Sequence, residues 1–166
     1  MAEKKKQVLV EQDIIEVPVE ENTDEEKNWT SNETVEFSGK YLKSVGRRKQ
    51  AAAQVRLYEG GKGVIMINGK RASEYFPGEG VGIITQPLKA TGHLRDFNFS
   101  VIVRGGGKMG QVDAVRLGIA RAIFIFDPAT KEALKVNNFL TRDPRQVERK
   151  KPGLRKARKA PQWSKR

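Results

Sequence analysis

Apolar and polar residues alternate in two stretches of this chain, residues 51–58 and 94–104, as is typical of a half-buried β-strand. The apolar sets are Ala53, Val55 and Leu57 in the first stretch, and Phe97, Phe99, Val101 and Val103 in the second. A shorter apolar run covers residues 64–67, and the glycine-rich residues 59–63 precede it. We therefore predict that the first strand and this run form a β-hairpin.

A helical period replaces the alternation in residues 111–126, where apolar residues recur every three or four positions. The predicted apolar face is Val112, Val115, Ile119, Ala122 and Ile123, with Arg116 and Arg121 outside it. Shorter helices are predicted for residues 72–76, 83–90 and 129–140, and Asp127-Pro128 separates the last of these from the long helix. These elements predict an α+β fold, in which a small sheet is backed by helices.

Neither end of the chain shows such a pattern, and the two ends carry opposite charge. Residues 1–39 contain 11 acidic and four basic side chains, whereas residues 40–166 contain nine acidic and 28 basic ones. We predict an acidic disordered N-terminal extension over residues 1–39, a globular RNA-binding domain over residues 40–141, and an extended basic tail over residues 142–166. Two roles stay open for the extension: an electrostatic mask for the basic body, or a neutral appendage.

The formal net charge is +12 and the isoelectric point about 10.0. This surplus indicates a polyanionic partner, for which RNA, DNA and an anionic membrane are the candidates. The absence of cysteine excludes disulfides, thiolate zinc sites and cysteine nucleophiles. No stretch reaches the roughly 18–20 apolar residues that span a bilayer, and Glu11 and Asp13 interrupt the segment behind the basic start. We therefore expect a cytoplasmic protein without a membrane partner.

The residues that enzymes use are scarce. His93 is the only histidine and follows Thr91-Gly92, so it is expected on a surface loop. Acidic residues are sparse in the body and do not cluster. We therefore expect no catalytic residues, no metal site and no cofactor.

A glycine-rich segment follows the second predicted strand and opens the long helix, the context of a phosphate-binding loop. It lacks the Gly-Lys-Ser/Thr ending of a Walker A loop, since Gln111 follows Gly110. A phosphate-binding enzyme is therefore disfavoured. Two interpretations remain and are compatible: a tight strand-to-helix turn, and a seat for an RNA phosphate on the backbone of Gly106 and Gly107, beside Lys108.

A second basic cluster, Arg47, Arg48 and Lys49, directly precedes the first predicted strand. The predicted hairpin adds four further cations, Arg56, Lys62, Lys70 and Arg71. Together they predict a continuous basic patch that binds RNA.

The tail is the strongest feature. Residues 150–166 hold eight basic side chains, no acidic one, and only two large apolar ones, Leu154 and Trp163. Ordering a residue's backbone costs about 1–2 kcal/mol, which this segment cannot recover by burial, so we expect a polyanion to order it. Trp163 is expected either to stack on a base or to anchor to a surface. The predicted RNA-binding residues are Arg142, Arg145, Arg149, Lys150, Lys151, Arg155, Lys156, Arg158 and Lys159.

Five blocks in this order resemble the ribosomal protein S-nine family of the small subunit, bacterial type: GRRKQAAAQVRLYEGGKG, IMINGKRASEYFP, VRGGGKMGQVDAVRLGIARAI, LTRDPR and QWSKR. The resemblance covers residues 41–166, and the acidic extension has no counterpart in it. It implies a four-stranded sheet packed on helices, like the second domain of ribosomal protein S-five. Where the family commonly has Phe or Tyr, this chain has Trp163.

The resemblance also implies a function. It implies a structural protein of the small-subunit head, with small-subunit ribosomal RNA and neighbouring ribosomal proteins as partners. It further implies that the tail reaches P-site tRNA, where Ser164, Lys165 and Arg166 approach phosphates of the anticodon stem-loop. The alternative is a free-standing basic nucleic-acid chaperone or a DNA-compacting protein, which the ordered blocks disfavour.

Overall fold

The computed structural model describes residue 37 and residues 39–165. Almost all of the predicted acidic extension, and Arg166 at the end of the tail, lie outside the described residues. The described residues belong to one unit, which spans residues 35–166. Its elements are β1 (Leu42–Arg48), β2 (Ala51–Glu59), β3 (Ile65–Ile67), β4 (Lys70–Arg71), α1 (Ala72–Tyr75), α2 (Gly80–Thr91), β5 (Phe97–Arg104), α3 (Lys108–Phe126), the 3-10 helix η2 (Pro128–Thr130) and α4 (Lys131–Val136).

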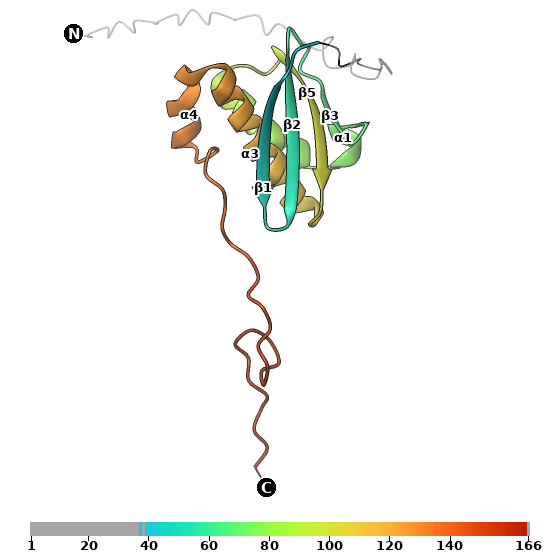
Figure 1. The fold of residues 1–166 in the computed structure, drawn as a ribbon. Helices are drawn as coiled ribbons and strands as arrows, with labels where there is room; N and C mark the ends of the chain where they lie inside the picture. Colours follow the sequence, from blue (N-terminus) through green and yellow to red (C-terminus); the bar gives the residue numbers. More distant parts are fainter. Residues whose placement is uncertain (1–36, 38, 166) are drawn as a thin grey trace, which may run out of the picture. The chain divides into compact units, whose positions relative to one another are not determined.

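The strands form one mixed sheet in the order β1-β2-β5-β3-β4 (Figure 1). Strands β1, β2 and β5 pair antiparallel, β3 runs parallel to β5, and β4 closes the edge antiparallel to β3. The α+β prediction is confirmed, and the sheet has five strands instead of the expected four. The additional strands are short or atypical in sequence: β4 has two residues, and the buried positions of β1 are Ser44 and Gly46.

The predicted hairpin between residues 51–58 and 64–67 is wrong. Strand β2 turns back on β1 through Lys49 and Gln50, and β5 lies between β2 and β3. The loop between β2 and β3 is bound to β5, because the Asn98 side chain accepts hydrogen bonds from the backbone N–H groups of Lys62 (2.9 Å) and Val64 (3.1 Å). The loop therefore crosses the end of β5, and β3 pairs on its far side.

The core lies between the sheet and the helices, and Figure 1 shows α3 behind the strands. The predicted inward faces of β2 and β5 are confirmed as buried, and so is the predicted apolar face of α3. Helix α3 approaches β1 closely, since the buried Ser44 hydroxyl donates a 2.7 Å hydrogen bond to the carbonyl of Gly118. Small residues at this crossing let a helix and an edge strand pack almost backbone to backbone.

Helix α4 ends at Val136, earlier than the expected residue 140, and Asn138 beyond it has a left-handed backbone (φ 55°). From residue 142 to residue 165 the chain contains no helix or strand. Among the helices described, none is long and apolar enough to cross a bilayer.

Candidate nucleic-acid interface

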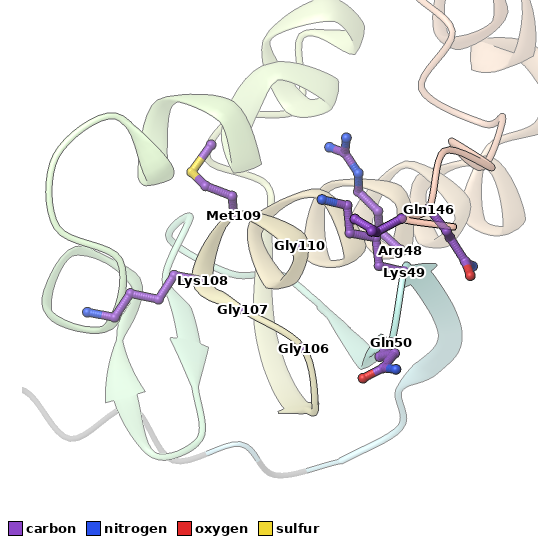
Figure 2. Close-up of a pocket in the computed structure, with 10 residues that line it drawn as sticks. Arg48, Lys49, Gln50, Gly106, Gly107, Lys108, Met109, Gly110 and Gln146 are labelled. Carbon is purple, nitrogen blue, oxygen red and sulfur yellow. The ribbon is translucent and has the colours of Figure 1, made fainter. Parts of the chain in front are cut away.

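A pocket of about 590 Å³ lies at the N-terminus of α3 (Figure 2). Its walls come from three separate segments: the β1–β2 turn, the start of α3 and the first part of the tail. The lining includes Arg48, Lys49, Gly106, Gly107 and Lys108. The fold thus brings together two basic clusters that are almost 60 residues apart in the sequence.

Glycines make this junction possible. Gly105 and Gly106 have left-handed backbones, with φ of 73° and 66°. A Cβ atom on Gly106 would lie 2.9 Å from the Cβ of Ala51, and one on Gly105 would lie 2.7 Å from the carbonyl oxygen of Gln50. The expected tight strand-to-helix turn is therefore confirmed.

The start of α3 is electrostatically positive. Its N-cap residue, Gly107, has no side chain, so no side-chain cap covers the first N–H groups of the helix. These groups carry the positive end of the helix dipole. Lys49 lies on one side of the helix start and Lys108 on the other, and both are exposed (Figure 2). Such a site favours an anion with several oxygen acceptors, such as a phosphate.

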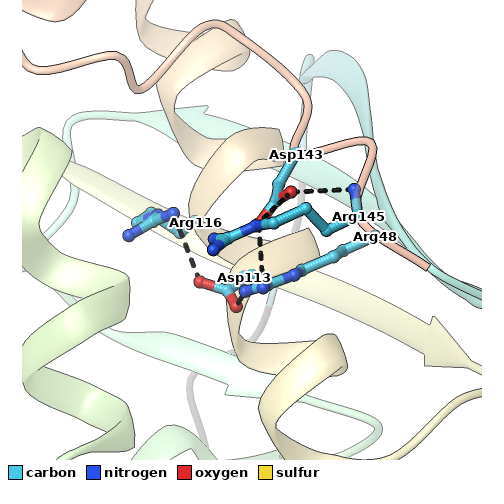
Figure 3. Close-up of polar contacts among 5 residues, drawn as sticks. All are labelled: Arg48, Asp113, Arg116, Asp143 and Arg145. Atoms are coloured by element: carbon cyan, nitrogen blue, oxygen red, sulfur yellow. Dashed lines mark hydrogen bonds and ion pairs between the residues drawn. The ribbon is translucent and has the colours of Figure 1, made fainter. Parts of the chain in front are cut away.

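Arg48 does not simply extend into this pocket, because two carboxylates hold its guanidinium (Figure 3). It forms an ion pair with Asp113 on α3, and its Nη2 lies 2.9 Å from an oxygen of Asp143 in the tail. Asp113 also pairs with Arg116, at 3.2 Å. The side chain of Asp113 is only 11% exposed and that of Arg48 21%. The main role of Arg48 is therefore structural, because its ion pairs connect β1 to α3 and to the tail.

The charges in this cluster shift one another's protonation. Hydrogen bonds from the Arg145 side chain and backbone, helped by the charges of Arg145 and Arg48, hold the pKa of Asp143 well below its usual range. Burial, followed by the nearby charge of Arg48, lowers the pKa of Arg116. Asp143 is therefore a carboxylate at every physiological pH, and the ion pairs persist.

The start of the tail is attached to the body through these pairs. Arg142 Nη2 also lies 3.4 Å from the carbonyl oxygen of Lys49.

We expect Asp143→Asn to loosen this attachment and to accelerate tryptic cleavage after Arg142 and Arg145, as measured by mass spectrometry over time. Because the folded-state pKa of Asp143 is depressed, the attachment is complete above about pH 4 and is lost only as the pH falls further. Glu74→Gln, an exposed change on α1, is the control and should leave the cleavage rate unchanged.

The rest of the tail exposes most of its predicted RNA-binding side chains. Arg149, Lys150, Lys151, Arg155, Lys156 and Lys159 are all exposed. Two of the other predicted cations have carboxylate partners: Arg145 pairs with Asp143, and Arg158 pairs with Glu148 at 2.6 Å. This second pair and the 2.7 Å backbone hydrogen bond from Arg155 N to Lys159 O fold residues 148–159 back on themselves.

The sequence interpretation missed the three carboxylates of these pairs. Asp113 and Arg116 have the i, i+3 spacing at which helical side chains meet, so this pair was detectable. The pairing of Arg48 with Asp113 and Asp143 had no local signal, because it joins residues from three distant segments.

The hairpin on which the continuous basic patch was predicted does not form. Lys70 instead pairs with Glu74 at 3.1 Å. Arg47 points to the face of the sheet away from α3, whereas its neighbour Arg48 points towards that helix. The cluster of Arg47, Arg48 and Lys49 is thus divided between two surfaces.

His93 lies in the loop before β5, where its Nδ1 atom is 2.7 Å from a carboxylate oxygen of Asp96. The side chain is 27% exposed, as befits a loop position. Within residues 39–165, no group of three or more His, Asp or Glu side chains is placed to hold a metal ion.

A comparison with known protein families shows a match over most of the chain. The family described as ribosomal protein S9/S16 matches residues 46–166, which include the α3 pocket and the whole tail.

Proposed function

Because this chain belongs to the ribosomal protein S9/S16 family, we propose that it binds small-subunit ribosomal RNA in the head of the subunit and reaches P-site tRNA with the end of its tail. Family membership makes it a structural protein of the ribosome and not an enzyme, with ribosomal RNA and other ribosomal proteins as partners. The predicted family and the predicted ribosomal location are thereby confirmed. A free-standing chaperone or DNA-compacting protein is not favoured.

The exposed basic tail is the main observation that supports the proposed contact with ribosomal RNA. Besides Arg158, which is exposed too, six Lys and Arg side chains between residues 149 and 159 are exposed, and the segment has no helix or strand. A chain of cations without a core binds best along a row of phosphates, where it displaces condensed counterions. We assign the ribosomal RNA contacts of the tail to these six residues and to Arg142, Arg145 and Arg158. We also propose that the chain divides into an N-terminal extension up to residue 39, a body up to residue 141 and the tail.

The α3 pocket supplies the second part of the RNA contact. The first backbone N–H groups of α3 have no side-chain cap, and Lys49 and Lys108 flank the start of the helix. We assign a phosphate of ribosomal RNA to this pocket, with Gly106 and Gly107 keeping the backbone accessible. Arg47 and Arg48 belong to the predicted contacts too, but Arg48 contributes through the position of the tail.

The tip of the tail is assigned to tRNA. Ser164 and Lys165 are exposed, and Trp163 before them is 82% exposed; Arg166 lies outside the described residues. These residues lie beyond every element of the body, so the fold does not depend on them. Positive charge at such a position is available to a ligand that arrives after the ribosomal RNA is in place.

Deleting residues 164–166 tests this assignment. We expect the truncated protein to assemble into small subunits normally, because no described contact joins these residues to the body. Binding of tRNA to the P site of the isolated subunits should weaken, and its log–log salt dependence should flatten by about 0.7–0.9 for each lost phosphate contact. Filter binding over a series of salt concentrations measures both quantities.

The matched control is the double variant R155Q/K156Q, which also removes two cations from the tail. It should leave tRNA binding unchanged once the subunits are assembled and should weaken the association of the protein with ribosomal RNA. Unchanged tRNA affinity after deletion of residues 164–166 would refute the role of the tip.

A further inference from the structure

The face of the sheet opposite α3 carries a second basic surface. Its outward-pointing cations are Lys43 and Arg47 on β1, Arg56 on β2 and Arg104 on β5. Figure 1 shows this face in front of the strands, with α3 behind them. We call these four residues the outer-face cations.

The strand register arranges these residues in two rows. Lys43 is directly opposite Arg56, and Arg47 and Arg104 are both opposite Ala52, one from each side. Neighbouring strands are about 4.8 Å apart, and four residues along a strand span about 13 Å. The four cations thus occupy an area of about 13 Å by 10 Å, a size that covers several nucleotides.

No described strand residue that points outward from this face is acidic. The other outward positions of β1, β2 and β5 are Val45, Ala52, Gln54, Tyr58, Asn98, Ser100 and Ile102. Like charges directly opposite each other on neighbouring strands are destabilising, so the pair of Lys43 and Arg56 opposes folding. Its charge is not balanced from within the sheet, and a bound polyanion would balance it.

Arg56 is held in place for such a contact. Its guanidinium lies 5.3 Å from the centre of the Tyr41 ring, and Tyr41 packs in turn against Tyr58, at 5.7 Å between ring centres. The Nε of Arg56 is buried and has no hydrogen-bond partner. Stacking on an aromatic ring leaves the terminal nitrogens of a guanidinium oriented towards solvent and ligand.

From these observations we propose that the outer face of the sheet is a second RNA-binding surface, separate from the α3 pocket and the tail. The inference rests on the proposed function, because it assumes that RNA is the main partner. It adds Lys43 and Arg104 to the RNA contacts and groups them with Arg47 and Arg56, which the sequence already assigned to an RNA-binding patch. The protein then contacts RNA on two opposite sides of its body.

The middle row of this face favours RNA over an acidic protein. Between the two basic rows lie Val45, Gln54 and Ile102, which face one another across three strands. Two apolar side chains and one amide between rows of cations suit sugars and base faces flanked by phosphates. Tyr41 is the only well-exposed aromatic ring near this face among the described residues, so little base stacking is available. Binding should therefore depend on the phosphates and vary little with sequence.

The test compares two double variants of the full-length protein, each lacking two exposed cations. R47Q/R104Q removes one row of the outer face, and K89Q/K135Q removes cations from the last turns of α2 and α4. Binding of a short fluorescein-labelled RNA hairpin is followed by anisotropy between 50 and 200 mM salt. We expect R47Q/R104Q to lower the affinity about tenfold and to flatten the log–log salt slope by about 1.4–1.8, whereas K89Q/K135Q should change neither.

Lys43 gives a readout at the surface itself. Acetylation of the unmodified protein, analysed by mass spectrometry, should show Lys43 protected when the RNA is bound and Lys89 equally reactive with and without it. This measurement does not depend on the folding of any variant.

The outcomes separate the inference from the proposed function. If R47Q/R104Q binds like K89Q/K135Q and Lys43 is not protected, while deletion of residues 150–166 weakens binding, the second surface is refuted and the tail proposal stands. An acidic protein would then be the remaining occupant of this face. If none of these changes weakens binding, both proposals fall.

Discussion

Replacing Gly46 by alanine is expected to lower the free energy of unfolding by about 3 kcal/mol or more, the upper end of the cost of overpacking a core. Gly46 is buried in β1 where the strand crosses α3. A Cβ atom there would overlap the carbonyl oxygen of Ala114 and would lie 2.5 Å from the backbone nitrogen of Gly118. Both neighbours are backbone atoms of a helix, so no side-chain rotation can relieve the overlap.

The helix must therefore move away from the strand, and this movement would also break the hydrogen bond from Ser44 to Gly118. Urea unfolding monitored by circular dichroism measures the change. The control is Gly82→Ala in α2, where a Cβ atom would have no heavy atom within 4 Å. Because alanine is a better helix former than glycine, the control should be neutral or more stable by about 0.5–1 kcal/mol. Equal stability of the Gly46→Ala protein and the original would contradict the close β1–α3 contact.

Replacing Asp113 by asparagine is expected to cost about 3 kcal/mol, because it leaves two arginines without their shared carboxylate in a largely buried site. Arg48 is 21% exposed and Arg116 30%. The lowered pKa of Arg116, caused first by its burial, shows that this environment already disfavours its charge. Asparagine has nearly the same shape as aspartate, so the loss is one of charge and not of volume.

Equilibrium unfolding and a double-mutant cycle test this expectation. Arg48→Met should cost less in the Asp113→Asn background than in the original protein, because the interaction that it removes is already lost. Glu74→Gln, which breaks the exposed pair with Lys70, is the control and should change stability by at most about 1 kcal/mol. Additive effects of the Arg48 and Asp113 changes would show that the ion pair contributes nothing.

Loss of the ion pair between Arg48 and Asp113 also affects the attachment of the tail, for which RNA binding is proposed. With Asp113 neutral, Arg48 retains Asp143 as its only carboxylate partner among the described residues. The tail and the β1–β2 turn meet through this pair, beside the α3 pocket. This partly buried network thus joins the body to the tail, for which RNA binding is proposed.

Where one face of an element is strongly apolar, the periodicity of the sequence was sufficient to predict which residues are buried. Residues such as Phe99 in β5 and Ile119 in α3 are completely buried, as the alternation and the helical period predicted. Composition was sufficient to predict that the tail cations are exposed, because a segment with many cations and almost no large apolar residues cannot form a core. The tail cations are indeed exposed, although Arg145 and Arg158 have local carboxylate partners.

Strand β1 shows why the pairing of the strands could not be predicted from the sequence. Its inward positions are Ser44 and Gly46, which carry no apolar signal, because their role is to let α3 come close. Without β1, the nearest partner in sequence for β2 was β3, and the wrong hairpin followed. Pairing depends on loop geometry and on side chains such as Asn98, which binds the loop before β3.

By itself the sequence determined the fold class, the buried faces of the main elements, the nucleic-acid character of the partner and, through its ordered blocks, the ribosomal family. The first three properties depend on local periodicity and on summed charge, and the family depends on the order of the sequence blocks. All of them can be read along the chain without knowing which residues are neighbours in space. Only the tertiary structure decided that Arg47 and Arg48 point to opposite sides of the sheet, that Arg48 is held by Asp113 and Asp143, and that Lys49 and Lys108 flank one helix start. These are contacts between distant segments, and their geometry exists only once strand order and register are set.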